Sequence, residues 1–291
     1  MIINQSLIKN DPLCKKFQNY LDEDLLLKEN DKIVISISGG RDSVTLLILL
    51  FVCEKYKLVN AHINHNLFEE SNKYNLFVKE ISNQFNIPFF SKDLDPKNKN
   101  KSTSTEEWAR NERYLFLNKV LKKTNSKYIM TAHHGNDQLE TLLMNLSRKT
   151  GVSGLKGISK KRGEIIRPML NMTKKEIIDF SNRTNLRFVN DPTNLDISIP
   201  RNFIRHKVIK PWELNYHHLI EGVTKSMQYF CEWEIALDYL IIELLVPSLV
   251  QSKNGFDIPF EIISGLPKIV KIRLIKILTD NKTELWSKHK Y

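Results

Sequence analysis

The segment Ser38–Ser43, SGGRDS, has the residue types and the spacing of a phosphate-binding loop. It follows a β-rich run and precedes a helical pattern, and Gly39 and Gly40 let the backbone approach a ligand without interference from a Cβ atom. The start of the helix offers free N–H groups and a positive dipole end to an anion. The two serines add hydroxyl donors, and Asp42 can hold a Mg²⁺ ion beside the phosphates. We therefore expect a pyrophosphate site, with an ordinary glycine turn as the alternative.

Two acidic residues further along the chain can meet on one face of a helix. Asp137 and Glu140 are three residues apart in a segment of helical pattern, and this spacing places both side chains on the same side. Two carboxylates that converge beside a nucleotide site would suit a cationic ligand. The alternative is that Asp137 only interacts with the helix dipole while Glu140 is solvated.

Two pairs of arginines are candidates for contacts with phosphate groups or with an RNA backbone. Arg110 and Arg113 lie near one helix face together with Glu107, and Arg201 and Arg205 are four residues apart. For the first pair, the alternative is an internal Glu–Arg pair on an exposed helix. For the second pair, it is a set of salt bridges that hold two domains together.

The histidines His62, His65, His133 and His134 lack the pattern of a zinc site, because no cysteine or carboxylate completes the ligand spacing. His133 and His134 follow a predicted strand. Since ligands bind at the carboxyl ends of the strands in open α/β sheets, we expect these two side chains to line a nucleotide pocket.

The composition is that of a folded protein with excess positive charge. The 291 residues are 41% hydrophobic and 26% charged, with a net charge of +11 that lies almost entirely in the first 190 residues. A polyanionic partner such as RNA would explain this excess, and an AT-rich genome that encodes a basic, solvated surface is the alternative. The three cysteines are widely separated, which excludes a disulfide scaffold or a four-cysteine metal site. The apolar runs are too short for a signal peptide or a membrane span, so we expect a reducing, aqueous compartment.

Short β-rich runs alternate with helical patterns over the first 190 residues, which is typical of βαβ units and a parallel sheet. The predicted strands are 32–38, 58–64, 87–94, 128–132 and 165–170. The predicted helices are 42–56, 72–85, 105–123, 136–147 and 173–184. Thr173 and Glu176 have the spacing of a capping box at the start of the last of these helices.

The segment 191–205 contains turn-forming residues and little periodicity, so we place a domain boundary inside it. Beyond residue 207 the pattern is helical, most clearly over 222–245. The sequence therefore predicts an α/β fold with a parallel, Rossmann-like sheet for residues 1–205, followed by a small α-helical domain for residues 206–291.

The loop at residues 38–43 resembles the PP-loop of the N-type ATP pyrophosphatases, which split ATP into AMP and pyrophosphate. It lacks the GKS or GKT ending of a Walker A motif and the GxGxxG pattern of dinucleotide sites. Over roughly residues 30–212 the chain resembles, in the order and spacing of its motifs, the tRNA(Ile)-lysidine synthetase family in its short form. The matching motifs are HINHNL at 62–67, EEWAR at 106–110, AHHGNDQLET at 132–141, GVSGLKGI at 151–158 and DPTN at 191–194.

This resemblance implies a ligase that forms a C–N bond and uses ATP with Mg²⁺. The expected reaction joins free L-lysine to C2 of the wobble cytidine of a tRNA(Ile) with a CAU anticodon, through an adenylated cytidine. The product changes decoding and charging from methionine to isoleucine. The resemblance further implies a location in the bacterial cytoplasm, or in the stroma of a plastid or other organelle if the gene is encoded there. It implies no membrane partner and leaves the assembly open between a monomer and a homodimer.

The resemblance also implies roles for individual residues. Those expected to be catalytic are Asp42, Arg113, Asp137 and Glu140. Those expected to bind ATP are Ser38, Gly39, Gly40, Arg41, Asp42, Ser43, His62 and His133. Lysine is expected to bind Asp137 and Glu140, and Asp42 is expected to hold Mg²⁺ through the phosphates of ATP. Those expected to bind tRNA are Arg110, Lys156, Arg201 and Arg205.

Three residues depart from the family pattern. Asn136 stands where a second aspartate is usual, Phe68 where an arginine is usual, and Lys149 where a small residue is usual. We expect Asn136 to weaken lysine or metal binding by the loss of a negative charge. We expect Phe68 to remove a phosphate contact and Lys149 to alter the loop that follows it.

Two other functions are compatible with the same loop. A degenerate member of the family would bind tRNA or ATP without turnover, which the departures and the short C-terminal part favour. A tRNA thiolase shares the loop but generally needs paired cysteines or an iron–sulfur site, and this chain has neither.

Overall fold

In the computed structural model of the protein, the residues whose structure is described are 3–66, 71–99, 103–252 and 255–280. They form two compact units. The first unit comprises the described residues of 1–147 and 157–224, and the second comprises 148–156 and the described residues from 225 onward. The units therefore divide the chain later than the predicted boundary after residue 205.

Residues 206–224 belong to the first unit because their apolar side chains pack on it. Leu139 of α6 (Gly135–Ser147) lies in one buried cluster with Ile209 and Ile220. This packing removes apolar surface from water, which stabilises the association of these helices. The separate roles expected for the two predicted domains stay predictions.

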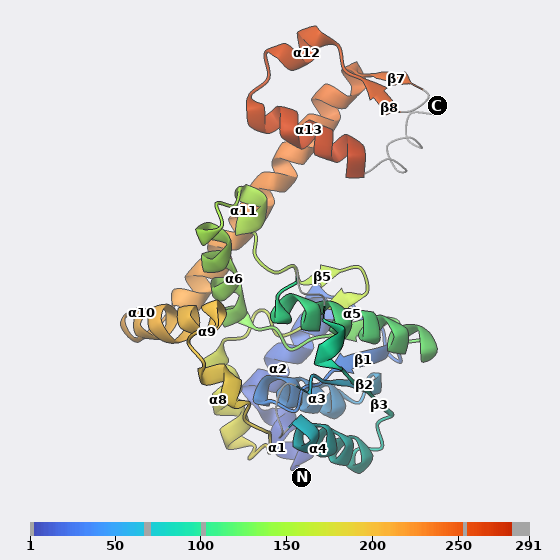
Figure 1. Cartoon of the computed structure of the whole chain (residues 1–291), viewed down its shortest axis with the longest axis vertical. Coiled ribbons are helices and arrows are strands. Elements are labelled where there is room, and N and C mark those ends of the chain that lie inside the picture. Colours follow the sequence, from blue (N-terminus) through green and yellow to red (C-terminus); the bar gives the residue numbers. More distant parts are fainter. Residues whose placement is uncertain (1–2, 67–70, 100–102, 253–254, 281–291) are drawn as a thin grey trace. The chain divides into compact units, whose positions relative to one another are not determined.

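A six-stranded sheet forms the centre of the first unit, in the order β3-β2-β1-β4-β6-β5 (Figure 1). Its strands are β1 (Lys32–Ser36), β2 (Lys57–Asn64), β3 (Phe89–Asp93), β4 (Tyr128–Met130), β5 (Lys161–Arg162) and β6 (Ile165–Ile166). Every neighbouring pair is parallel except β5 with β6. The predicted parallel sheet is confirmed, and the short antiparallel edge strand β5 adds to it.

The strand order changes direction between β1 and β4. The chain passes from β1 to β2 and β3 on one side, and then returns to β4 and β6 on the other. In open α/β sheets, ligands bind beyond the carboxyl ends of the strands at such a switch point. The phosphate loop (Ser38–Ser43) follows β1, and the segment 131–140 follows β4. The topology therefore brings the predicted phosphate site and the predicted acid pair to one position.

Helices cover both faces of this sheet. Ile33 and Ile35 of β1 are fully buried in a cluster that also includes residues of α3 and α8. Val34, which points to the opposite face, packs with Phe116 and Leu117 of α5. The helical segments of the first unit are α1 (Gln5–Asn10), α2 (Pro12–Asn19), η1 (Tyr20–Asp24), α3 (Arg41–Cys53), α4 (Ser71–Gln84), η2 (Pro96–Asn98), α5 (Thr105–Lys123), α6, α8 (Lys174–Arg183), η3 (Pro192–Leu195), α9 (Pro200–Phe203), η4 (Ile204–Ile209) and α10 (Lys210–Asn215).

The second unit is mainly helical. The predicted helix over 222–245 is present as the long helix α11 (Leu219–Leu240), which begins in the first unit, and the π-helical segment η5 (Ile241–Leu245) that continues it. The other segments are α7 (Val152–Leu155), η5 (Ile241–Leu245), η6 (Val246–Ser248), β7 (Val250–Ser252), β8 (Gly255–Asp257), α12 (Phe260–Ser264) and α13 (Lys268–Asp280). The antiparallel pair β7–β8 was not predicted, because strands of three residues are too short to show a period of two. Among the described residues, no helix is long and apolar enough to cross a membrane.

Candidate active site

The phosphate loop closes on itself through its two serines. The backbone N–H of Ser38 donates to Oγ of Ser43 at 3.2 Å, and that hydroxyl donates to the carbonyl oxygen of Gly40 at 2.9 Å. Gly39 has a φ of +88°, which an L-residue with a side chain rarely adopts. The strand–loop–helix arrangement that the sequence predicted is confirmed, with Gly40 as the N-cap of α3.

A segment that follows α8 holds the phosphate loop from one side. The backbone N–H of Val189 donates to the carbonyl oxygen of Gly39 at 3.0 Å. The guanidinium of Arg41 lies over the ring of Phe188, 4.4 Å from its centroid. Such a cation–π contact stabilises a charged side chain that is partly removed from water. Arg41 therefore anchors the loop to this segment, a role that its position in the motif does not reveal.

Asp42, the expected partner of Mg²⁺, forms an ion pair with the ammonium of Lys174. Its other carboxylate oxygen lies 3.7 Å from Nε2 of His134. Across the residues that the structure describes, no group of three His, Cys, Asp or Glu side chains is arranged as a metal site. Mg²⁺ needs no such group, because it is usually held by one or two carboxylates together with substrate phosphates and water. The single carboxylate of Asp42 fits that kind of site.

The two acids and the two C-terminal arginines among the predicted site residues form one cluster, which we call the acid–arginine network (Asp137, Glu140, Arg201 and Arg205). Nε of Arg201 lies 2.6 Å from Glu140, and NH2 of Arg201 lies 3.0 Å from Asp137. Arg205 makes two hydrogen bonds to Glu140, at 2.6 and 3.0 Å. Glu140 is completely buried. A buried carboxylate without partners would be strongly destabilising, and the two arginines supply these partners to Glu140.

Asp137 is held in its charged form by its surroundings. Burial by itself would raise the pKa of Asp137, but the nearby His134, Arg201 and His133 outweigh this and hold it well below its usual range. The backbone N–H of His134 also donates to Asp137 at 2.9 Å. Asp137 is therefore an anion that a bound cation could share with Arg201.

His134 lies between the phosphate loop and the acid–arginine network. Its side chain is 5% exposed, with Nε2 3.7 Å from Asp42 and Nδ1 3.6 Å from Asp137. The two predicted sites are thus separated by a single imidazole ring. The confirmed topology of the sheet explains this, since Asp42 follows β1 and Asp137 follows the neighbouring β4.

His133 and His62, the two histidines expected to bind ATP, are neutral hydrogen-bond donors or acceptors. Burial lowers the pKa of His133 to about 4, and its Nδ1 lies 2.8 Å from the hydroxyl of Thr131. Burial also lowers the pKa of His62, whose Nδ1 donates to the carbonyl oxygen of Ile37 at 2.8 Å. This leaves Nε2 of His62 as a buried acceptor with no partner among the described residues. Ile37, which accepts from Nδ1 of His62, directly precedes the phosphate loop.

Arg110 and Arg113 differ in their surroundings. Burial lowers the pKa of Arg113, and the charge of Arg110 acts in the same direction. Arg113 also helps to lower the pKa of His65 to about 4, after the larger effect of burial. Arg110 is exposed, and its guanidinium lies over the ring of Tyr114 at 5.2 Å. A half-buried guanidinium next to a second arginine is a place where a bound anion would be stabilising.

Comparison with known proteins agrees with this geometry. A family model described as a PP-loop domain matches residues 10–212. The tRNA(Ile)-lysidine synthase of Thermotoga maritima is 39% identical over 283 residues, which cover 90% of this chain and 68% of that protein. The chain belongs to this family. The tRNA(Ile)-lysidine synthase of Thermosipho africanus is 40% identical over 202 residues, covering 68% of this chain and 47% of that protein.

Two further comparisons set the extent of this likeness. The chain spans about half the length of other curated relatives, such as 53% of the Clostridium perfringens tRNA(Ile)-lysidine synthase at 34% identity. Among solved structures, the U34-tRNA thiolase NcsA from Methanococcus maripaludis, with its 4Fe–4S cluster, matches with a TM-score of 0.64. That match covers 75% of this chain and 77% of the other at 16% identity, so it shows a shared fold alone.

The structure gives physical reasons for two departures from the family pattern. Nδ2 of Asn136 donates to Glu213 at 2.8 Å, and its Oδ1 accepts a hydrogen bond from the backbone N–H of Lys174 at 2.8 Å. Lys149 has a φ of +57°, a left-handed conformation that glycine adopts more easily than lysine. Phe68 lies outside the described residues.

Lys156, a predicted tRNA-binding residue, belongs to the second unit. Its ammonium forms an ion pair with Glu234, which also accepts a hydrogen bond from Ser153. NH1 of Arg273 lies 3.0 Å from Oε1 of Glu234, the oxygen that also accepts from Ser153. Within its unit, Lys156 therefore helps to connect α7 and α11.

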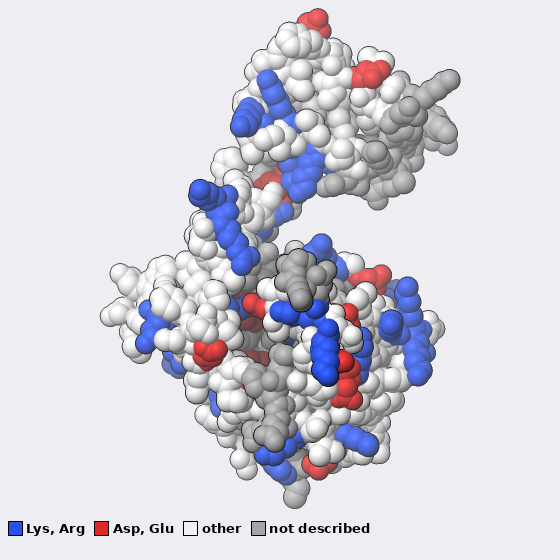
Figure 2. All heavy atoms as spheres, in the orientation of Figure 1, with Lys and Arg blue, Asp and Glu red and all other residues white. Residues whose placement is uncertain are grey.

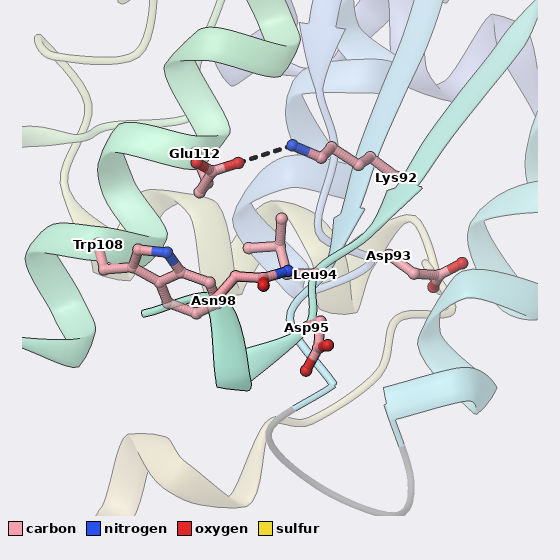
Figure 3. Close-up of a pocket in the computed structure, with 7 residues that line it drawn as sticks. All are labelled: Lys92, Asp93, Leu94, Asp95, Asn98, Trp108 and Glu112. Carbon is pink, nitrogen blue, oxygen red and sulfur yellow. Dashed lines mark hydrogen bonds and ion pairs between the residues drawn. The ribbon is translucent and has the colours of Figure 1, made fainter. Parts of the chain in front are cut away.

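A cavity of about 220 Å³ opens at the carboxyl end of the edge strand β3 (Figure 3). It is lined by Lys92, Asp93, Leu94, Asp95, Asn98, Trp108 and Glu112. Lys92 and Glu112 form an ion pair across it at 2.6 Å. Its lining includes no residue of the phosphate loop or of the acid–arginine network.

Sequence reasoning did not find three of the residues that the structure places at the site. Lys174, Phe188 and Glu213 contact Asp42, Arg41 and Asn136, respectively. A local signal existed only for Lys174, which directly follows the N-cap Thr173 of the predicted capping box.

Proposed function

We propose that the chain joins lysine to C2 of the wobble cytidine of a CAU-anticodon tRNA(Ile), in a reaction that converts ATP to AMP and pyrophosphate. The observation that carries this proposal is the position of His134. It lies between Asp42 of the phosphate loop and Asp137 of the acid–arginine network, at 3.7 and 3.6 Å. A site for nucleotide phosphates and a site for a charged amino acid therefore adjoin.

In the first step, ATP binds with its pyrophosphate part on the phosphate loop. The free N–H groups at the start of α3 and the serine hydroxyls contact the phosphate oxygens, and Asp42 is the residue that would hold the Mg²⁺ that neutralises part of their charge. Nε2 of His62 accepts a hydrogen bond from the nucleoside part. The O2 atom of the cytidine attacks the α-phosphate, the bond to the β-phosphate breaks, and pyrophosphate leaves. Positioning and fixed charges supply most of the acceleration in such a transfer.

The acid–arginine network suits free lysine, which carries positive ammonium groups and a negative carboxylate. Asp137 meets an ammonium group, while Arg201 and Arg205 are available to the carboxylate. Glu140 is completely buried and bonded to both arginines, so its part is to hold them in place as well as to add negative charge. The ε-amine of lysine then attacks C2 of the adenylated cytidine and AMP leaves.

The tRNA brings a polyanion to this basic protein, whose net charge is +11. Arg113, a half-buried cation close to His65, is placed to meet a phosphate group. Lys and Arg side chains also gather over the carboxyl end of α5, where Lys122 and Lys123 lie in the last turn (Figure 2). Arg110 and Lys156 add further contacts to the RNA backbone. The protein acts in the compartment that holds this tRNA.

The thiolase alternative is disfavoured by the cysteines themselves. Cys14 is buried, and burial raises its pKa to about 11; burial likewise raises the pKa of Cys53 to about 12. Sulfur transfer and cluster ligation use the thiolate, which such groups rarely form at neutral pH.

Incubation of the protein with ATP, Mg²⁺, labelled lysine and an unmodified tRNA(Ile) transcript tests the proposal. We expect label in this tRNA and none in an elongator tRNA(Met) transcript with the same anticodon. Asp42→Ala should abolish incorporation, because the loop then lacks its carboxylate for Mg²⁺. Asp137→Ala should raise the lysine concentration that is needed, whereas Asp257→Ala, on β8, should change neither. Binding of ATP and tRNA without any incorporation would identify a degenerate family member and refute the proposal.

A further inference from the structure

Lys174 is held in a defined position beside the phosphate loop. It is the first residue of α8, whose start is secured by a capping box between Thr173 and Glu176. The backbone N–H of Lys174 also donates to Oδ1 of Asn136, in α6, at 2.8 Å. Because two helices fix its backbone, the Lys174 side chain starts from a rigid point, and its ammonium contacts Asp42.

This position is unfavourable for the stability of the helix. A cation in the first turn faces the positive end of the helix dipole, and Lys175 adds a second positive charge there. The side chain of Lys174 is 35% exposed, so a ligand at the phosphate loop can reach its ammonium. The contact that offsets this cost is the ion pair of Lys174 with the Asp42 carboxylate.

The phosphate loop itself contributes no cation that points toward the ligand side of the loop. Its one basic residue, Arg41, has its guanidinium over Phe188. Nε of Arg41 is buried without a hydrogen-bond partner among the described residues, so this group is turned into the protein. A lysine ammonium is a compact point charge that commonly binds phosphate oxygens.

We propose that Lys174 is a phosphate-binding residue of the ATP site, an inference that rests on the proposed function. When ATP and Mg²⁺ bind, the ammonium of Lys174 leaves Asp42 and binds the phosphates instead. Asp42 would then hold Mg²⁺, and the ammonium of Lys174, released from the Asp42 carboxylate, turns to the neighbouring phosphate oxygens. As the bond between the α- and β-phosphates breaks, its electron pair passes to the pyrophosphate. The ammonium of Lys174 stabilises the negative charge that forms there.

Isothermal titration of the full chain with ATP and with AMP, both in the presence of Mg²⁺, tests this role. Lys174→Met should raise the Kd of ATP by about 10- to 100-fold, the effect of losing one charge-assisted hydrogen bond. The Kd of AMP should change by less than about threefold, because AMP lacks the pyrophosphate. Lys174→Arg, which keeps the charge, should restore most of the ATP affinity. Lys175→Met, which changes the exposed neighbour, should match the wild type.

Lys174→Gln separates the role of the charge from any role in folding. Glutamine can still donate a hydrogen bond to Asp42, so the local structure is kept while the charge is lost. Equal weakening of ATP and AMP binding in this variant, or unchanged ATP binding, would overturn the assignment. The outcome is separable from the proposed function. If the wild type never incorporates lysine but the Lys174 variants lose ATP affinity, only the proposed ligase activity is refuted. If the wild type incorporates lysine but the Lys174 variants bind ATP as well as it does, only the role of Lys174 is refuted.

Discussion

Asn136 shows how a single residue of the family pattern depends on its neighbours in the fold. Its amide donates to Glu213 and accepts from the backbone of Lys174. The aspartate that is usual at this position could accept the second hydrogen bond, but it would place a negative charge next to the Glu213 carboxylate. The contacts of Asn136 thus link α6, α8 and α10, and its effect on the ligand sites passes through Lys174.

Asn136→Asp should lower the free energy of unfolding by about 1–3 kcal/mol at neutral pH, because a partly buried hydrogen bond is replaced by the repulsion of two carboxylates. The double variant Asn136→Asp/Glu213→Gln should regain most of this loss, since the glutamine can donate to the new aspartate. Urea unfolding of the wild type, both single variants and the double variant measures the coupling. A single variant Asn136→Asp as stable as the wild type would contradict this account.

At the scale of elements, the phosphate loop is shaped by a segment distant in the sequence. The backbone N–H of Val189 donates to the carbonyl oxygen of Gly39, and the guanidinium of Arg41 lies over the ring of Phe188. The hydroxyl of Tyr74, in α4, donates to the carbonyl oxygen of Asn190 at 3.2 Å. The loop therefore lies between α4 and the segment after α8. The packing of these neighbours therefore limits which residues fit at Gly39 and Gly40, in addition to any limit set by a bound ligand.

The two glycines of the loop should respond differently to substitution by alanine. At Gly39 the φ is +88°, and a Cβ atom would lie 3.0 Å from Val189 and 3.2 Å from Val78. Gly39→Ala should therefore destabilise the first unit by about 1–3 kcal/mol and weaken ATP binding. At Gly40 the φ is −71° and the nearest atom to a new Cβ lies at 3.5 Å. Gly40→Ala is the matched control and should change stability by no more than about 0.5 kcal/mol.

Thermal unfolding and ATP titration of the two alanine variants, side by side, measure these differences. If Gly40→Ala were the more destabilising, the loop would not have the backbone conformation described above. Loss of ATP affinity in Gly40→Ala at full stability would instead mean that the ligand itself approaches this residue.

At the scale of the whole molecule, the site combines buried and half-buried histidines with a basic surface. Burial lowers the pKa values of His65 and His133 from the ordinary 6.5 to about 4. A group with a lowered pKa in the folded protein binds protons more readily in the unfolded chain. Acid therefore favours unfolding. The contribution of these two rings to stability is complete above about pH 6.5 and is lost progressively as the pH falls toward about 4.

The free energy of unfolding should accordingly be smaller at about pH 5 than at about pH 7, and the double variant His65→Asn/His133→Asn should show a weaker dependence in this range. His217→Asn, at an exposed position, serves as the control and should keep the dependence of the wild type. Urea unfolding followed by circular dichroism at the two pH values provides the comparison. An unchanged dependence in the double variant would show that other groups cause it.

Much of the fold follows from patterns that are local in the sequence. The strands β1, β2 and β4, the helix α3 and the capping box of α8 were all predicted, because alternation, helical spacing and capping involve residues within a few positions of one another. The phosphate loop belongs to this class, since one short segment contains both its glycines and its serines. The switch point then placed it beside the segment after β4.

The partners of the charged residues were decided only by the tertiary structure. Arg205 meets Glu140 across 65 positions of sequence, and Lys174 meets Asp42 across 132. Nothing local distinguishes an arginine that will pair with a buried acid from one that will face an RNA. Sequence thus determined which residues carry charge and that a phosphate loop follows β1. The packing of α6, α8 and η4 around the sheet determined which charges meet, because ion pairs form between groups that the fold brings within a few ångströms.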